Sequence, residues 1–249
     1  MVGNMDSQRL LEIKKDSHKA IEFAVAYTNK GEYAEALEMF EWFHFNALSI
    51  RSSLYGVRLS FALGYWMKLT KVYPMAKQRL LEIRDEEIEK IKGSKWSFEG
   101  FHDVAAISKQ FEDSQTPLEI FKWIDKNETD QNKIAKCFNV IFESLCEKDE
   151  LELCNKYLTD PESKAKKYVD LFKQAESGIS QYFKKINEDA EKKELVQQSL
   201  TSMRKKYMHD MSLLVKILKS VNRHKDLESI YVIGKGIIPD EQYLEIFKK

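Results

Sequence analysis

The stretch HKAIEFAVAYTNKGEYAEALEMFEWF, residues 18–43, contains two apolar helical faces separated by a short break. The first face places apolar residues at spacings of three and four, at Ala20, Phe23, Ala24 and Tyr27. Gly31 ends the break because glycine readily adopts the left-handed conformation that closes a helix. The second face follows at Tyr33, Ala36, Leu37, Phe40 and Phe43. Since Ala24 and Ala36 are small enough for two backbones to approach closely, the stretch predicts an antiparallel helix pair.

A second stretch, from about residue 57 to residue 90, repeats this arrangement. The positions that correspond in character are Leu63, Gly64, Met67, Tyr73, Ala76, Leu80 and Ile83. The separation of Leu63 from Ala76 equals that of Phe23 from Ala36, which is the signature of an internal repeat. We therefore expect Gly64 to pack against Ala76, as Ala24 packs against Ala36.

The first helix pair resembles one tetratricopeptide repeat, and the second pair resembles it with departures. The matching residues are Phe23, Ala24, Tyr27, Gly31, Tyr33, Ala36 and Phe40. Phe43 and Ile83 stand where the family usually has alanine, and Lys71 replaces the turn glycine. The two pairs are offset by about 40 residues, whereas the family repeat has 34. The resemblance implies an all-α fold, a right-handed solenoid of helical hairpins that binds partners on its concave face.

The remainder of the chain also follows helical spacing. Two further hairpins are expected over residues 102–124 and 134–158 without the signature residues of the repeat. Residues 164–221 contain no proline and predict two long helices, with a break near Asn187 to Glu194. We therefore assign residues 1–160 to a repeat region, with its clearest repeats at 17–50 and 57–90. Residues 161–249 form a C-terminal helical extension that we expect to pack on the repeats as one continuous unit.

Composition limits the class of protein. The 249 residues include 40 basic and 40 acidic side chains, so no net charge favours binding to nucleic acid or an anionic membrane. Nine glycines and four prolines are too few for a turn-rich β fold. Neither a secretory signal nor an apolar run of about 20 residues is evident, and the cysteines follow no disulfide framework. We expect a cytoplasmic protein with no membrane partner, and whether residues 1–4 are native stays open.

The repeat resemblance also implies a partner-binding groove lined by the first helix of each hairpin. Its predicted residues are Ile21, Val25, Thr28, Asn29, Arg58, Phe61, Ala62, Tyr65 and Lys68. Apolar side chains at Ile21 and Val25 disfavour a clamp for a peptide carboxylate and favour an apolar segment, such as a partner helix. The alternative is that later helices of the chain cover this face as core.

An aromatic segment follows the second repeat, and Trp96, Phe98 and Phe101 are its candidate anchors for a partner. Exposed aromatic residues dominate binding hot spots, which is the functional interpretation. The structural interpretation is that the segment fills the gap between two repeats. His102 and Asp103 are adjacent in sequence, and neighbours of this kind seldom orient one another for acid–base catalysis.

No other motif indicates a catalytic, metal-binding or cofactor-binding site. The histidines and cysteines do not follow the spacing of metal ligands, and no phosphate-binding glycine loop occurs. The sequence therefore predicts no catalytic residue, no metal and no cofactor. Residues 234–247, GKGIIPDEQYLEIF, are similar to the end of a pentatricopeptide repeat, a hairpin that reads RNA one base at a time in tandem arrays.

The predicted function is non-enzymatic binding of a protein or peptide partner, as an adaptor, assembly factor or regulator. The first alternative is a helical-repeat protein associated with RNA or DNA, which would need a contiguous basic groove. The second is an enzyme with its site in the C-terminal helices, which would need convergent acids or histidines. The oligomeric state and the identity of the partner do not follow from the sequence.

Overall fold

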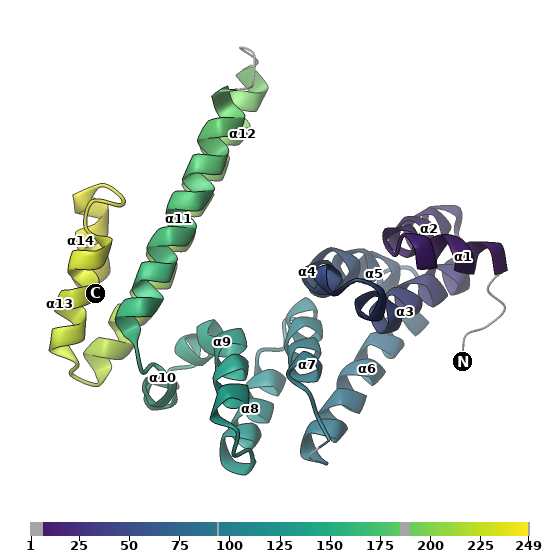
Figure 1. Ribbon diagram of the computed structural model, residues 1–249, viewed down its shortest axis with the longest axis horizontal. Coiled ribbons are helices and arrows are strands. Elements are labelled where there is room, and N and C mark those ends of the chain that lie inside the picture. Colours follow the sequence, from purple (N-terminus) through teal and green to yellow (C-terminus); the bar gives the residue numbers. More distant parts are fainter. Residues whose placement is uncertain (1–6, 94, 185–189, 249) are drawn as a thin grey trace. The chain divides into compact units, whose positions relative to one another are not determined.

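The computed structural model describes residues 7–93, 95–184 and 190–248, and every regular element in these ranges is helical (Figure 1). The predicted all-α class is therefore confirmed. The chain divides into two compact units, residues 1–141 and 142–249. The predicted boundary between residues 160 and 161 falls inside the second unit, and the predicted packing into one continuous unit stays a prediction. Residues 1–4, whose origin the sequence leaves open, lie outside the described residues.

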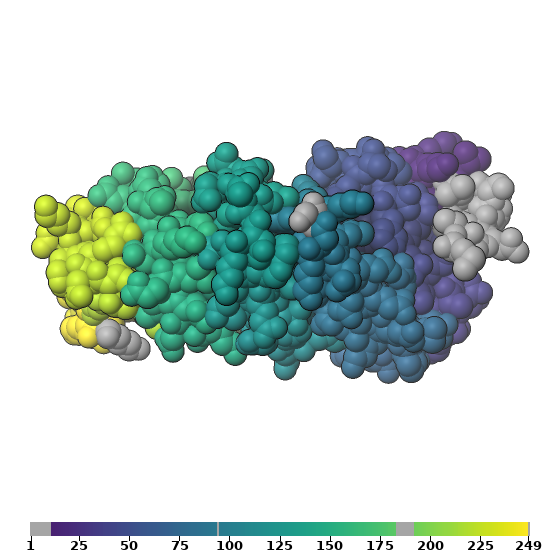
Figure 2. Space-filling view, turned by 90° about the horizontal axis from the view of Figure 1, so that it is seen from below, coloured from purple at the N-terminus to yellow at the C-terminus, as the bar shows by residue number. Residues whose placement is uncertain are grey.

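The first unit is built from consecutive helices, many of which pack against their neighbours in the chain. Its elements are α1 (Ser7–Lys15), α2 (His18–Lys30), α3 (Tyr33–Ile50), η1 (Ser52–Leu54), α4 (Tyr55–Val57), η2 (Arg58–Ala62), α5 (Leu63–Thr70), α6 (Pro74–Lys92), α7 (Phe98–Gln110), α8 (Gln115–Asn127) and most of α9 (Gln131–Glu147). The side chains of α6 form part of the packed surface of this unit in the space-filling view (Figure 2). The predicted repeat ranges 17–50 and 57–90 thus correspond to α2 with α3, and to α4 through α6.

The turn between α2 and α3 has the predicted glycine conformation. Gly31 has a φ of 82°, in the left-handed region, and its N–H donates to the carbonyl oxygen of Thr28. Ala24 and Ala36 are both fully buried in one core cluster. This cluster also contains Phe40 and Trp66, whose rings stack at 5.7 Å between centroids. Small residues at the helix contact and large rings beside them therefore form the core of the first unit.

The second hairpin differs from the prediction at Gly64. A Cβ atom added to Gly64 would meet no atom within 4 Å, so the predicted close contact between Gly64 and Ala76 is wrong. A residue of α5 that does contact Ala76 is Trp66, whose indole N–H donates to the carbonyl oxygen of Ala76 at 3.2 Å. The segment directly before α5 is η2, which is a π-helix over Arg58–Ala62. A π turn contains more residues than an α turn, which displaces the faces that α periodicity predicts.

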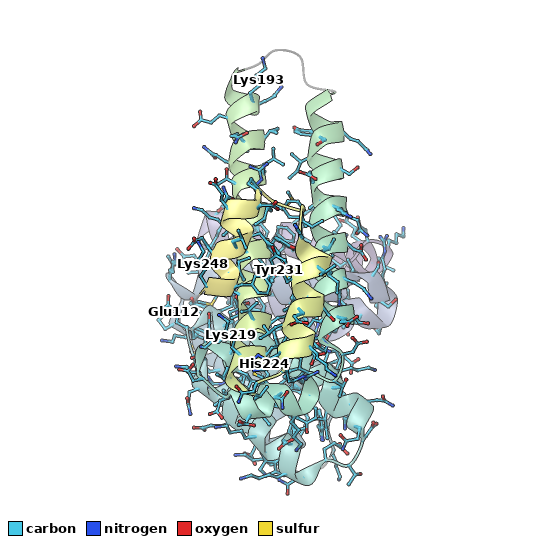
Figure 3. All side chains as sticks on the ribbon, turned by 90° about the vertical axis from the view of Figure 1, so that its left-hand side faces the viewer. Glu112, Lys193, Lys219, His224, Tyr231 and Lys248 are labelled. Carbon is cyan, nitrogen blue, oxygen red and sulfur yellow. The ribbon has the colours of Figure 1, made fainter. Side chains whose placement is uncertain are left out.

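The second unit is built on two long antiparallel helices. Its elements after α9 are α10 (Leu151–Tyr157), α11 (Pro161–Lys184), α12 (Ala190–Ser220), α13 (His224–Gly234) and α14 (Asp240–Lys248). Figure 3 shows α13 and α14 side by side against one end of the α11–α12 pair, with Lys193 at its far end. The two long helices were predicted. The predicted break overlaps residues 185–189, which lie outside the described residues, and residues 190–194 already belong to α12.

Two glycines provide a matched test of this backbone description. A Cβ added at Gly31 or at Gly178, within α11, would meet no atom within 4 Å, so neither substitution creates a clash. We expect Gly31→Ala to lower the free energy of unfolding by about 1–2 kcal/mol, because alanine is strained at positive φ. Gly178→Ala should raise it by about 0.5–1 kcal/mol through helix propensity. Urea unfolding followed by circular dichroism measures both, and equal effects would contradict the assignment.

Candidate interaction groove

An open cavity of about 690 Å³ lies on the first unit. We call it the α2–α5 groove, and its lining residues are His18, Ile21, Glu22, Val25, Ala26, Asn29, Val57, Phe61 and Tyr65. Two stripes of residues form it. The residues from α2 recur every three or four positions along one helical face, and Val57, Phe61 and Tyr65 follow one another at intervals of four. The groove therefore arises where α2 faces the continuous α4–η2–α5 segment.

The floor of the groove is apolar and rests on a buried core. Val25, Val57 and Tyr65 are partly buried and pack against a cluster that contains Ile21 and Ala62. Phe61 lies at the edge of the groove and is 69% exposed, although a large apolar side chain normally gains free energy by burial. A partner that covered Phe61 would therefore remove substantial apolar surface from water.

Polar groups surround this floor. Glu22 is exposed and pairs with Lys19 at 2.8 Å, and an exposed pair of this kind contributes little to stability. Asn29 is also exposed. On the other side, the Lys68 ammonium lies 4.9 Å from the centroid of the Tyr65 ring, within the range of a cation–π interaction. An apolar centre with a polar rim is the usual composition of a protein–protein interface.

The structure brings together only part of the predicted groove. Of the predicted residues, the lining of the cavity includes Ile21, Val25, Asn29, Phe61 and Tyr65. Arg58 and Ala62 are buried in the interior and are not lining residues, so their predicted exposure to a partner is wrong. Thr28 is half-buried and donates to the carbonyl oxygen of Ala24, and Lys68 is exposed beside Tyr65. Both Arg58 and Ala62 lie in the π-helical segment, and Arg58 turns inward to pair with Asp103.

The sequence reasoning missed His18, Glu22, Ala26 and Val57, all of which line the groove. The three on α2 could have been found from helical geometry, since each lies three positions before Ile21, Val25 or Asn29 on the same face. Val57 could have been found in the same way, since it precedes Phe61 by four positions.

The aromatic segment before α7 is mostly internal. Phe101 is fully buried, with its ring centroid 6.4 Å from that of Phe121, so its prediction as an exposed anchor is wrong. Phe98 is half-buried beside His102. Trp96 is also half-buried, and the Lys133 ammonium lies 3.5 Å from its ring centroid. Ser97 caps α7 by accepting a hydrogen bond from the Gly100 N–H, and Phe101 packs in the interior against Phe121 of α8.

A buried ion pair fixes η2 against α7. The Arg58 guanidinium donates to Asp103 Oδ2 at 2.9 Å and lies 2.8 Å from Oδ1, while His44 Nε2 lies 3.2 Å from the same guanidinium. Burial raises the pKa of Asp103 to about 6, against the opposing charge of Arg58. Burial, followed by the positive charge of Arg58, lowers the pKa of His44 to about 3. His44 is therefore neutral in the folded protein at neutral pH.

His102 and Asp103 do not act as a pair. The Asp103 carboxylate contacts Arg58, whereas His102 Nδ1 lies 2.9 Å from the Tyr55 hydroxyl. Burial is the largest cause that lowers the pKa of His102, and burial also raises the pKa of Tyr55 to about 12. Asp103 thus pairs with Arg58 and His102 with Tyr55, and these four side chains supply no arrangement of nucleophile and base.

Comparison of the chain with protein-family models, with curated proteins and with solved structures finds no match. Among the helices that the structure describes, none combines the length and apolar character that a membrane crossing requires. The tetratricopeptide resemblance therefore stays a prediction that rests on the residues named above.

The environment of His44 predicts a pH dependence. Its folded pKa is about 3 and its ordinary value is 6.5, so the unfolded chain binds the proton more readily between these values. His44 thus contributes stability above pH 6.5 that is lost as the pH falls toward 3. We expect the difference in unfolding free energy between wild type and His44→Gln to fall by about 1.4 kcal/mol per pH unit between pH 6 and 4.

Denaturant unfolding at a series of pH values measures this difference. Asp103 is present in both proteins, so its opposing contribution largely cancels. A difference that is constant over this pH range would show that His44 is not held neutral by burial.

Proposed function

We propose that the first unit is a non-enzymatic interaction module that binds one amphipathic helix of a partner protein in the α2–α5 groove. The observation that carries the proposal is the open, apolar groove with Phe61 largely exposed at its edge. Large exposed aromatic residues beside an apolar pocket are common anchors of protein interfaces. The resemblance to a tetratricopeptide repeat supports the same class of function.

The form of the groove favours a helix over an extended peptide. An extended peptide that binds by strand addition needs a sheet edge, and every regular element of the described residues is helical. A helix instead inserts apolar side chains spaced three and four residues apart into an apolar groove. The volume of about 690 Å³ accommodates several such side chains.

The polar side chains at the rim of the groove indicate which polar residues a partner helix would carry. Glu22 is exposed next to the apolar floor, with Asn29 further along the same helix. A basic residue on the partner helix could pair with Glu22 in competition with Lys19, and Asn29 offers both a donor and an acceptor. We therefore assign the partner an apolar stripe flanked by lysine or arginine.

Selection from a displayed library of amphipathic helical peptides, against the 249-residue chain, tests this function. We expect the selected peptides to share an apolar stripe with basic flanks. Phe61→Glu should weaken their binding at least about tenfold, or 1.4 kcal/mol, because it replaces the apolar side chain that the partner would cover with a charge that would have to lose water. Fluorescence anisotropy with a labelled selected peptide measures the dissociation constant.

Phe45→Glu is the matched control, since Phe45 is also an exposed phenylalanine of this unit, at 53%, and does not line the groove. We expect it to leave the affinity unchanged, with both variants showing wild-type circular dichroism. Equal affinities for wild type and Phe61→Glu would refute the groove as the binding site. Binding of RNA or DNA instead of peptides would favour the alternative class.

A further inference from the structure

The second unit contains a cluster of three metal-ligating side chains that the sequence does not reveal. Glu143 and Glu147 lie one helical turn apart on α9, and His209 comes from α12. His209 Nε2 lies 2.8 Å from Glu143 Oε1. One ligand atom from each of the three residues lies within 4.8 Å of the other two. The cluster therefore joins two helices that are distant in sequence.

Contacts that do not involve the three ligands also join α9 to α12. The Lys216 ammonium, on α12, donates to the carbonyl oxygen of Cys146 at 2.8 Å and pairs with Asp149 at 2.6 Å. Cys146 lies between Glu143 and Glu147 in sequence and is fully buried. The backbones that carry the three ligands are thus fixed by groups other than the ligands, as a preorganised site requires.

The donor set selects the class of metal. One imidazole nitrogen and two carboxylate oxygens suit Zn²⁺ better than Mg²⁺ or Ca²⁺, which prefer oxygen alone. Bonds of about 2.0–2.2 Å to zinc place ligand atoms about 3–3.6 Å apart. The three ligand atoms lie within 4.8 Å of one another, so rotation of the exposed glutamate side chains would be needed to reach that range.

We propose that Glu143, Glu147 and His209 bind one Zn²⁺ ion, with water at the remaining position. The three residues are partly or largely exposed, at 48% for the side chain of Glu143 and 41% for that of His209. Metal and water can therefore reach the site from solvent. The ion would cross-link the end of α9 to the middle of α12.

A second feature adjoins the site. His209 also lines a cavity of about 520 Å³ between α12 and α14, together with Met208, Ser212, Val215, Lys216, Lys219, Glu245 and Ile246. Lys219 lies beside α14 in Figure 3, and its ammonium donates to the carbonyl oxygen of Phe247. An ion held by His209 would thus lie at the edge of a space large enough for an additional ligand. This is the open arrangement of a site with an exchangeable position.

Isothermal titration of the tag-free, reduced 249-residue chain with Zn²⁺ tests the proposal. We expect one ion per chain, and an affinity reduced at least about tenfold in His209→Gln and in the double variant Glu143→Gln, Glu147→Gln. The controls are His224→Gln and Glu152→Gln, which replace an exposed histidine and an exposed glutamate of the same unit. Both controls should bind as the wild type does.

Two further measurements keep the test decisive. Zn²⁺ should raise the melting temperature of the wild type and of the controls but not of the ligand variants, since a ligand of the folded state stabilises it. The absorption spectrum of bound Co²⁺ should lack the strong bands of thiolate ligation, which excludes the cysteines. Equal zinc affinity of wild type and His209→Gln, or absence of binding at about 0.1 mM Zn²⁺, would overturn the proposal.

Discussion

The buried ion pair between Arg58 and Asp103 is the interaction on which the first unit depends. Both side chains are nearly inaccessible to solvent, and removing one partner of such a pair leaves an uncompensated charge, at a cost of about 3–5 kcal/mol. The pair holds Arg58, the first residue of the π turn, against α7. With Arg58 turned inward, Val57, Phe61 and Tyr65 line the opposite, open side. The charge pair in the core and the apolar groove on the surface are therefore two consequences of one backbone feature.

The two units present different chemistry. In the first unit, stacked rings and buried alanines support a groove whose floor is apolar and whose rim is polar, which suits recognition of a helix. In the second unit, carboxylates and an imidazole converge at the contact between α9 and α12. Under our proposals, the first unit binds a partner by burial of Phe61, and the second is stabilised by a metal. Neither proposal depends on the other.

Local patterns predicted the helices and the turn at Gly31, because apolar spacing and glycine conformation are determined within a few residues. They also predicted most of the apolar groove residues on α2. They failed at Arg58, Ala62 and Gly64, since nothing in a periodicity of 3.6 residues indicates a π turn. Phe101 was misplaced because its burial depends on Phe121. The Glu143–His209 contact joins residues far apart in sequence, so spacing along the chain could not reveal the candidate metal site.

A double-mutant cycle on the pair Arg58→Met and Asp103→Leu tests most directly whether this ion pair organises the first unit. Each single substitution should lower the free energy of unfolding by about 3–5 kcal/mol. The double variant should recover much of that loss, because replacing both charges by apolar side chains removes the unpaired group. The coupling energy between the two positions should therefore be at least about 2 kcal/mol. Additive effects of the two substitutions, with a coupling energy near zero, would contradict the account.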